Sequence, residues 1–112
     1  MTRQSHTAAV DRNQMWRGEF TTEPYESAWA SEAIFFVRAL HAQNIPADAQ
    51  ARVQISPDGI HWCDEGTTFA LPMQDEELTF GRVKHFGGWL RLAGNLPTKA
   101  QLNVIAYLAL KE

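Results

Sequence analysis

The side chains best suited to chemistry are concentrated in one stretch, His61-Trp62-Cys63-Asp64-Glu65. On a strand, His61 and Cys63 would share a face, because side chains two positions apart point to the same side. A histidine beside a thiol suits a nucleophile, and adjoining carboxylates suit a metal ion. However, the chain has one cysteine, and no ligand pair recurs at a zinc-type spacing. We therefore expect a structural thiol and no metal, with an enzyme using His61 and Cys63 as a third alternative behind two non-enzymatic functions.

The other reactive side chains have no partner that the sequence places beside them. The carboxylates lie mostly in turns, so two of them are not expected to converge in a glycosidase-type pocket. Gly87-Gly88 precedes a strand rather than the N-terminus of a helix, which argues against a phosphate-binding loop. No Ser-His-Asp arrangement is indicated. We expect a protein without catalytic residues and without a cofactor.

Composition narrows the class of protein and its partners. A chain of 112 residues with 45% hydrophobic and 21% charged residues is typical of one globular domain. The net charge is −3, and the ten basic residues are scattered singly. We expect no nucleic-acid partner, because such binding requires a basic patch that the sequence lacks.

The sequence also bears on localisation. No apolar run approaches the roughly 20 residues of a membrane span, and the N-terminal residues lack the apolar segment of a signal peptide. A single cysteine rules out an internal disulfide and suits a reducing compartment. These features predict a cytoplasmic protein or a component of a particle assembled there.

The elements that must position these groups are predicted to be short strands separated by turns. Turns with Gly or Pro recur about every ten residues, a pattern typical of an antiparallel β-sandwich or jelly roll. The expected strands are residues 33–42 (with a helix as the alternative), 52–56, 60–64, 67–71, 78–85, 89–93 and 102–110. Residues 1–22 are polar and lack periodicity, so they are expected to form an N-terminal arm on a sandwich of residues 23–112.

Two features of this pattern predict that the protein assembles. In the last strand, Ile105 and Tyr107 lie on the face opposite the leucines, so the strand is apolar on both sides. Such a strand is either central in a layered fold or faces a partner. In the arm, Trp16 and Phe20 are costly to leave in water and should dock, either on their own domain or on a neighbouring copy. These four residues form the expected interface.

The turn Ser56-Pro57-Asp58-Gly59 leaves two hairpin registers open. A three-residue loop would pair Ile55 with His61 and leave Trp62 on the outer face, whereas a four-residue loop would pair Ile55 with Ile60 and bury Trp62. Turn chemistry favours the first register and the hydrophobic pattern favours the second. We expect a buried Trp62, because burying a tryptophan stabilises a fold by a few kcal/mol.

The stretch S-P-D-G-I-H-W resembles the S-x-D-G-x-x-W hairpins of discoidin-like and other glycan-binding β-sandwich modules. Together with G-G-W-L-R-L and the final apolar strand, it is also similar to small sandwich or jelly-roll proteins of phage virions and capsid-like shells, over about residues 35–110. The first resemblance implies a glycan-binding module, in which we expect Trp62 or Trp89 to act with Asp58 and Asp64. The second implies a structural role.

These observations together predict a non-enzymatic structural or interaction protein. It would assemble with itself or into a larger particle, such as a virion, a shell or another multi-subunit complex. The alternative is a carbohydrate-binding module that stacks a sugar on an exposed tryptophan, although aromatic side chains are more often core or subunit contacts.

Overall fold

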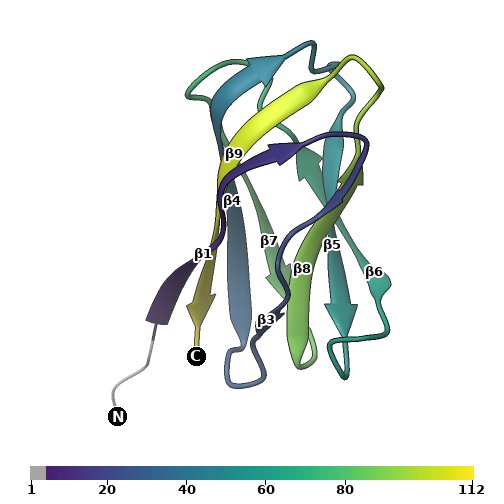
Figure 1. Cartoon of the computed structure of the whole chain (residues 1–112). Coiled ribbons are helices and arrows are strands. Elements are labelled where there is room, and N and C mark those ends of the chain that lie inside the picture. Colours follow the sequence, from purple (N-terminus) through teal and green to yellow (C-terminus); the bar gives the residue numbers. More distant parts are fainter. Residues whose placement is uncertain (1–4) are drawn as a thin grey trace.

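Residues 5–112 are described by the structure, a computed structural model, and they form nine β-strands and no helix. The strands are β1 (Ser5–Trp16), β2 (Glu19–Thr21), β3 (Tyr25–Glu26), β4 (Glu32–Gln43), β5 (Gln50–Ser56), β6 (Cys63–Ala70), β7 (Leu78–Lys84), β8 (Trp89–Asn95) and β9 (Gln101–Lys111). Figure 1 shows them as two facing layers. The predicted all-β class is confirmed, and the segment for which a helix was the alternative is strand β4.

The order of the strands identifies the architecture. Sheet A has the order β1-β9-β4-β7, and sheet B has the order β2-β8-β5-β6, with β3 also paired to β8. Every pairing is antiparallel. Apart from the steps from β2 to β3 and from β5 to β6, each strand is followed by one in the opposite sheet. This winding between a four-stranded and a five-stranded layer is the jelly-roll form of the β-sandwich.

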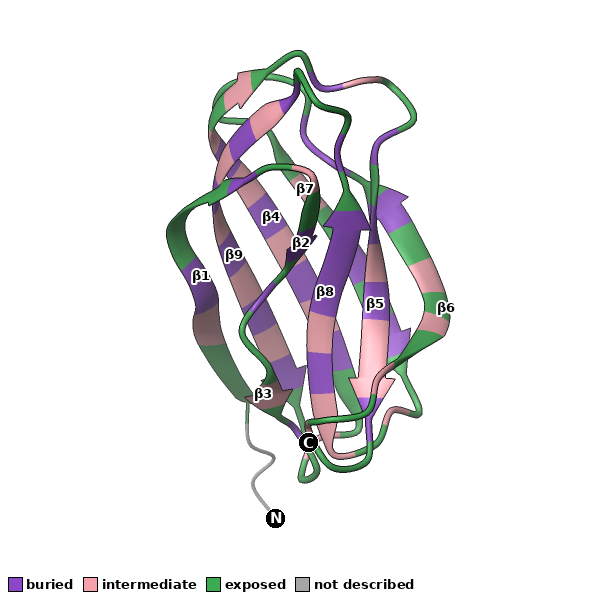
Figure 2. Ribbon diagram, turned by 45° about the vertical axis from the view of Figure 1, so that its right-hand side comes forward, coloured by how far each residue is buried: buried purple, intermediate pink, exposed green. Residues whose placement is uncertain are grey.

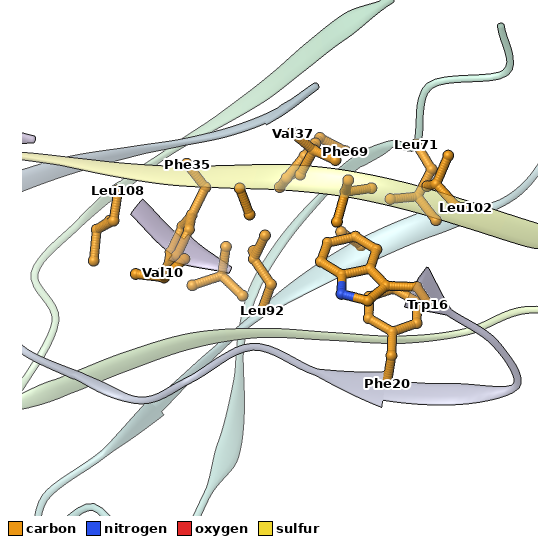
Figure 3. Close-up of a cluster of buried hydrophobic side chains, with 14 of the residues drawn as sticks. Val10, Trp16, Phe20, Phe35, Val37, Phe69, Leu71, Leu92, Leu102 and Leu108 are labelled. Atoms are coloured by element: carbon orange, nitrogen blue, oxygen red, sulfur yellow. The ribbon is translucent and has the colours of Figure 1, made fainter. Parts of the chain in front are cut away.

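Alternation along the long strands places the core between the sheets. On β4 and β9, fully buried side chains alternate with half-buried ones, as the purple and pink bands of Figure 2 show. Figure 3 shows the inward side chains of both sheets meeting in one cluster. Each large apolar side chain that is fully buried there contributes about 1.5–3 kcal/mol. The largest are Phe35, Leu90, Leu92, Leu102, Leu108 and Leu110.

The expected N-terminal arm is instead part of the sandwich from residue 5 onward. Residues Ser5–Trp16 form β1, which pairs with β9 along its length, and Glu19–Thr21 pair with β8 in sheet B. The register of β1 shifts twice, between Ala9 and Asp11 and between Asp11 and Gln14. These irregularities disrupt the period of two by which a strand is recognised. The boundary expected at residue 22 is therefore not a boundary of the fold, and residues 1–4 of the expected arm lie outside the described residues.

The hairpin between β5 and β6 follows neither expected register. Ile55 pairs with Cys63 and Gln54 pairs with Asp64, so residues 57–62 form a wider loop. Ile60 is 74% exposed, and Trp62 is half-buried and lies outside the core cluster. The expectation of a core Trp62 is therefore wrong. The loop is wide because side chains bind its backbone, as described below, and this competes with a tight turn.

Candidate functional site

The outer face of sheet A carries adjoining apolar side chains from three strands. Five of them form what we call the sheet A patch: Ile34 and Phe36 from β4, Phe80 from β7, and Ile105 and Tyr107 from β9. Phe36 lies opposite Phe80 on one side and Tyr107 on the other. The ring centroids of Phe36 and Phe80 are 6.2 Å apart, and Phe80 is 48% exposed. The patch therefore crosses the middle of the sheet in one row, with Ile34 and Ile105 in the adjoining rows.

Charged and polar groups surround the patch. The guanidinium of Arg82 lies 5.0 Å from the centroid of the Phe80 ring. Arg38 lies opposite Ile105 in the ladder, and its Nε is 3.6 Å from Glu76 Oε2. Within the described part of the chain, Arg38 Nε and Asn103 Oδ1 are shielded from water without a hydrogen-bond partner. A partner that covered the patch would not increase the desolvation cost of these two atoms, because they are already shielded from water in the isolated chain.

Two of the four expected interface residues lie on the patch, and two lie elsewhere. Ile105 and Tyr107 face outward, as the pattern of the last strand predicts. Trp16 and Phe20 are only 3% and 7% exposed, and their rings stack with centroids 4.1 Å apart (Figure 3). They dock on their own domain, the first of the two arrangements considered for the arm. In this fold they are not available to a neighbouring molecule.

Asp58 organises the β5–β6 loop. Its Oδ1 accepts the backbone N–H groups of Ile60 and His61, each at 2.8 Å, and its Oδ2 lies 2.7 Å from His61 Nδ1. Ser56 Oγ accepts the N–H of Gly59 at 2.8 Å. The backbone N–H of His61, followed by its side chain, holds the pKa of Asp58 well below its ordinary range. The carboxylate proposed for sugar binding is thus bonded within its own loop.

The two tryptophans of the expected glycan site each have a ring face occupied by the protein. The guanidinium of Arg91 lies 4.2 Å from the centroid of the Trp62 ring. Trp89 packs against Gly59, where an added Cβ would lie 3.2 Å from the indole. Both tryptophans are half-buried. Asp58, Trp62 and Trp89 therefore lie in or against one loop.

Asp64, the fourth expected glycan residue, belongs to a hydrogen-bonded network on the outer face of sheet B. Asp64 Oδ1 accepts Gln54 Nε2 at 2.9 Å and Arg52 Nε at 3.3 Å. Gln54 Oε1 in turn accepts Arg91 Nε at 2.8 Å. The Gln54 amide, followed by Arg52, lowers the pKa of Asp64. The network fixes two guanidinium groups on adjacent strands.

His61 and Cys63 do not form the pair that nucleophilic catalysis would need. His61 Nδ1 is directed to Asp58, and Cys63 Sγ lies 3.9 Å from the carbonyl oxygen of Ile55. Cys63 is exposed and free. Across residues 5–112, no three side chains of His, Cys, Asp or Glu are grouped so that they could hold a metal ion.

Sequence reasoning missed several residues of both surfaces. Phe80 lies in a run whose alternation is weak, because Gly81 interrupts the inward positions. Gln54 and Arg91 were not singled out, although each is the outward neighbour of buried residues on its strand. Strand alternation could have found all three, but only pairing across strands shows that Phe80 lies beside Phe36 and that Gln54 lies beside Arg91.

Comparison with protein-family models and with curated proteins finds no match to this chain. Over the described residues, no helix is long enough and apolar enough to cross a membrane. The outer faces of the two sheets are the surfaces that bear on function.

Proposed function

We propose that this protein is a non-enzymatic structural component that assembles with itself through the sheet A patch. The observation that carries the proposal is the row of Tyr107, Phe36 and Phe80 across the middle of an uncovered sheet face, flanked by Ile34 and Ile105. Outward positions of an antiparallel sheet that faces water are normally polar. Exposed apolar groups that adjoin one another mark interaction surfaces.

The size of the face agrees with the core of an interface. The patch spans three strands about 4.8 Å apart and three rows of side chains about 6.8 Å apart, so it covers roughly 14 by 20 Å, or about 300 Å². A stable interface buries about 800 Å² on each partner, with an apolar centre and a polar rim. The patch provides the centre, and the charged groups beyond its two ends would form the rim.

The distribution of charge around the patch favours a second copy of the chain as the partner. At one end of sheet A, Lys84 and Lys111 lie on either side of Glu32 of β4, with Arg82 in the next row, so three cations there outnumber one carboxylate. At the other end, the loop Asp75-Glu76-Glu77 contacts β4 at Ala39 and Ala42. If two copies pack face to face about a two-fold axis perpendicular to the strands, the basic end of each meets the acidic end of the other. The surface is thus complementary to itself.

The oligomeric state tests this proposal. Light scattering coupled to size exclusion, run across a range of protein concentrations, should show a dimer or a larger closed oligomer. The double variant Ile105→Asp with Tyr107→Asp should be monomeric, because charges would be buried without partners. Ile60→Asp is the matched control, since it makes the same kind of change at a residue that is 74% exposed and lies outside the patch. Thermal melts of each variant establish that it is folded.

A second variant guards against misfolding of the first. Phe80→Asp lies on the edge strand β7 and is already 48% exposed, so the fold should tolerate it, and it should weaken the oligomer as well. A wild-type protein that stays monomeric at every concentration would contradict self-assembly. So would an oligomer that both patch variants leave intact.

The proposal extends, as a prediction, to a larger particle. Jelly rolls are used in viral capsids as well as in unrelated proteins, so the architecture permits a virion or shell component but does not establish one. Electron microscopy of the concentrated wild-type protein would look for shells or tubes. Particles of that kind should be absent from the Ile105→Asp, Tyr107→Asp variant.

A further inference from the structure

The outer face of sheet B contains a hollow beside a small residue. Ala93 faces outward on β8, yet it is only 2% exposed, because larger side chains cover it. The hollow that these side chains line has a volume of about 300 Å³. Cavities that hold small ligands begin at about this volume, so it suits a molecule the size of one sugar ring. We call it the Ala93 hollow. Its polar lining residues are Glu19, Thr21, Arg52, Gln54, Arg91 and Asn95.

Two guanidinium groups of the Ala93 hollow are held in place before any ligand arrives. Arg91 is fixed on both sides, by the Trp62 ring at 4.2 Å and by Gln54 Oε1 at 2.8 Å. Arg52 is fixed through its Nε to Asp64. In the described part of the chain, the hydrogen bonds and ion pairs of both residues use Nε. Their terminal nitrogens remain as donors, and a guanidinium offers these in the fork geometry that matches a carboxylate.

The electrostatics of the Ala93 hollow favour an anion. Partial burial, followed by the nearby charge of Arg52, lowers the pKa of Arg91. Asp64 is paired with Arg52, whereas Arg91 bonds the neutral Gln54 amide and has no ion pair among the described residues. The charge of Arg91 lies beside the cavity. Glu19 lines the cavity but forms no ion pair with either arginine among the described residues. A bound carboxylate would relieve the repulsion between the two guanidinium groups.

The remaining polar groups suit hydroxyl groups rather than further charge. Thr21, on β2, provides a hydroxyl group, and Asn95, on β8, provides an amide. Both side chains line the cavity. The Glu19 carboxylate can accept hydrogen bonds from ligand hydroxyls at the far side. We propose that the Ala93 hollow binds an acidic monosaccharide, a sugar ring that bears a carboxylate, with Arg91 and Arg52 as the donors to that carboxylate. This site lies in sheet B and does not depend on the proposed assembly through sheet A.

Titration of the full chain with glucuronate, glucose and acetate tests the proposal. The readouts are the NMR signals of the Arg91 Nε–H and the Trp62 indole N–H, which place any binding in the hollow. Glucuronate should shift both signals. Glucose has the ring without the carboxylate, so it should bind at least about tenfold more weakly, the range expected when charge-assisted hydrogen bonds are lost. Acetate has the carboxylate without the ring, so it should also bind more weakly, because it loses the contacts of the ring and its hydroxyl groups. Added salt should weaken the binding of glucuronate.

Variants separate the site from a general effect of charge. Arg91→Gln should lower glucuronate affinity about tenfold or more, and Arg91→Lys should restore only part of it, because lysine lacks the fork. Arg82→Gln is the matched control, since it removes an arginine that stacks on an aromatic ring of the other sheet. The inference is overturned if glucuronate does not bind, if glucose or acetate binds as tightly, or if Arg91→Gln and Arg82→Gln act alike. None of these results would alter the oligomeric state by which the assembly proposal is judged.

Discussion

Adding a single methyl group at Gly94 should disturb the docking of the N-terminal strands on the sandwich. Gly94 lies opposite Phe20 in sheet B, and a Cβ at this position would lie 2.4 Å from Phe20 Cζ and 2.7 Å from Cε2. It would also lie 3.1 Å from the carbonyl oxygen of Gln50, so the backbone leaves little room for adjustment. The Phe20 ring must therefore move, and it is stacked on the buried Trp16 ring.

The magnitude follows from two opposing contributions. Overpacking a core costs about 1–3 kcal/mol. Replacing glycine by alanine recovers about 0.4–1 kcal/mol, because it restricts the unfolded chain. The net loss for Gly94→Ala is therefore about 1–2 kcal/mol. With an unfolding entropy of about 2.1 cal/mol/K per residue, the chain of 112 residues should lose roughly 4–9 °C in Tm.

A double-mutant cycle with Phe20→Leu isolates the clash. Leucine lacks the Cζ and Cε2 atoms, so Gly94→Ala should cost almost nothing in that background, as measured by urea unfolding and by thermal melts. Gly87→Ala is the control, because its added Cβ would meet only the Ser56 carbonyl oxygen at 3.8 Å. If Gly94→Ala costs the same with and without Phe20, the contact is not the cause, and the docking of β2 on β8 is not as described.

Further predictions concern three single side chains. Asp11→Ala should lower the free energy of unfolding by about 1–3 kcal/mol, because the buried indole N–H of Trp16 loses its acceptor at 2.9 Å, whereas Asp11→Asn keeps an acceptor and should cost less in urea titrations. Burial raises the pKa of the Asp11 carboxyl group, so the folded state binds a proton there more tightly than the unfolded state does. The free energy of unfolding of the wild type should therefore fall as pH rises through that pKa, and Asp11→Asn should remove this pH dependence. The pH dependence that comes from Asp58 has the opposite sign. Because the pKa of Asp58 is lowered in the folded state, its carboxylate adds stability at pH values above the ordinary pKa of 3.8, and this stability is lost as pH falls below 3.8. Thermal melts of Asp58→Ala should therefore show a smaller loss of stability in acid. Cys63 is exposed, so a thiol reagent should label it in the native protein at a rate close to that in urea, and the melting temperature should change little; slow labelling would contradict its placement at the surface.

The fold was predictable where a strand alternates without interruption. Residues Leu102 to Leu110 alternate buried and half-buried side chains, and β9 has the expected outward face with Ile105 and Tyr107. The run around Phe35 and Phe36 was likewise recognised as a strand with two apolar faces. In both cases a local signal of period two was strong enough to be read without knowledge of the neighbouring strands.

The parts that sequence reasoning missed depend on side-chain bonds and on pairing between distant strands. Asp58 accepts two backbone N–H groups of its own loop, which replaces a tight turn by a wide one and moves Trp62 out of the ladder. The register shifts around Asp11 hide β1 as a strand. The Ala93 hollow requires Arg52 and Arg91 on adjacent strands, and their separation of thirty-nine positions in the sequence gives no local sign of this.

The pairing of β1 with β9 has a consequence for how the protein is made. Ser5 lies opposite Lys111, and the ladder continues to Trp16 opposite Leu102. During synthesis, the N-terminal strand therefore waits without its partner until almost all of the described chain has left the ribosome. Contacts of such long sequence separation make folding slow and leave unpaired strand edges exposed meanwhile. Folding should accordingly begin in the local β5–β6 hairpin and finish at sheet A, so the apolar outer face of that sheet would be completed last.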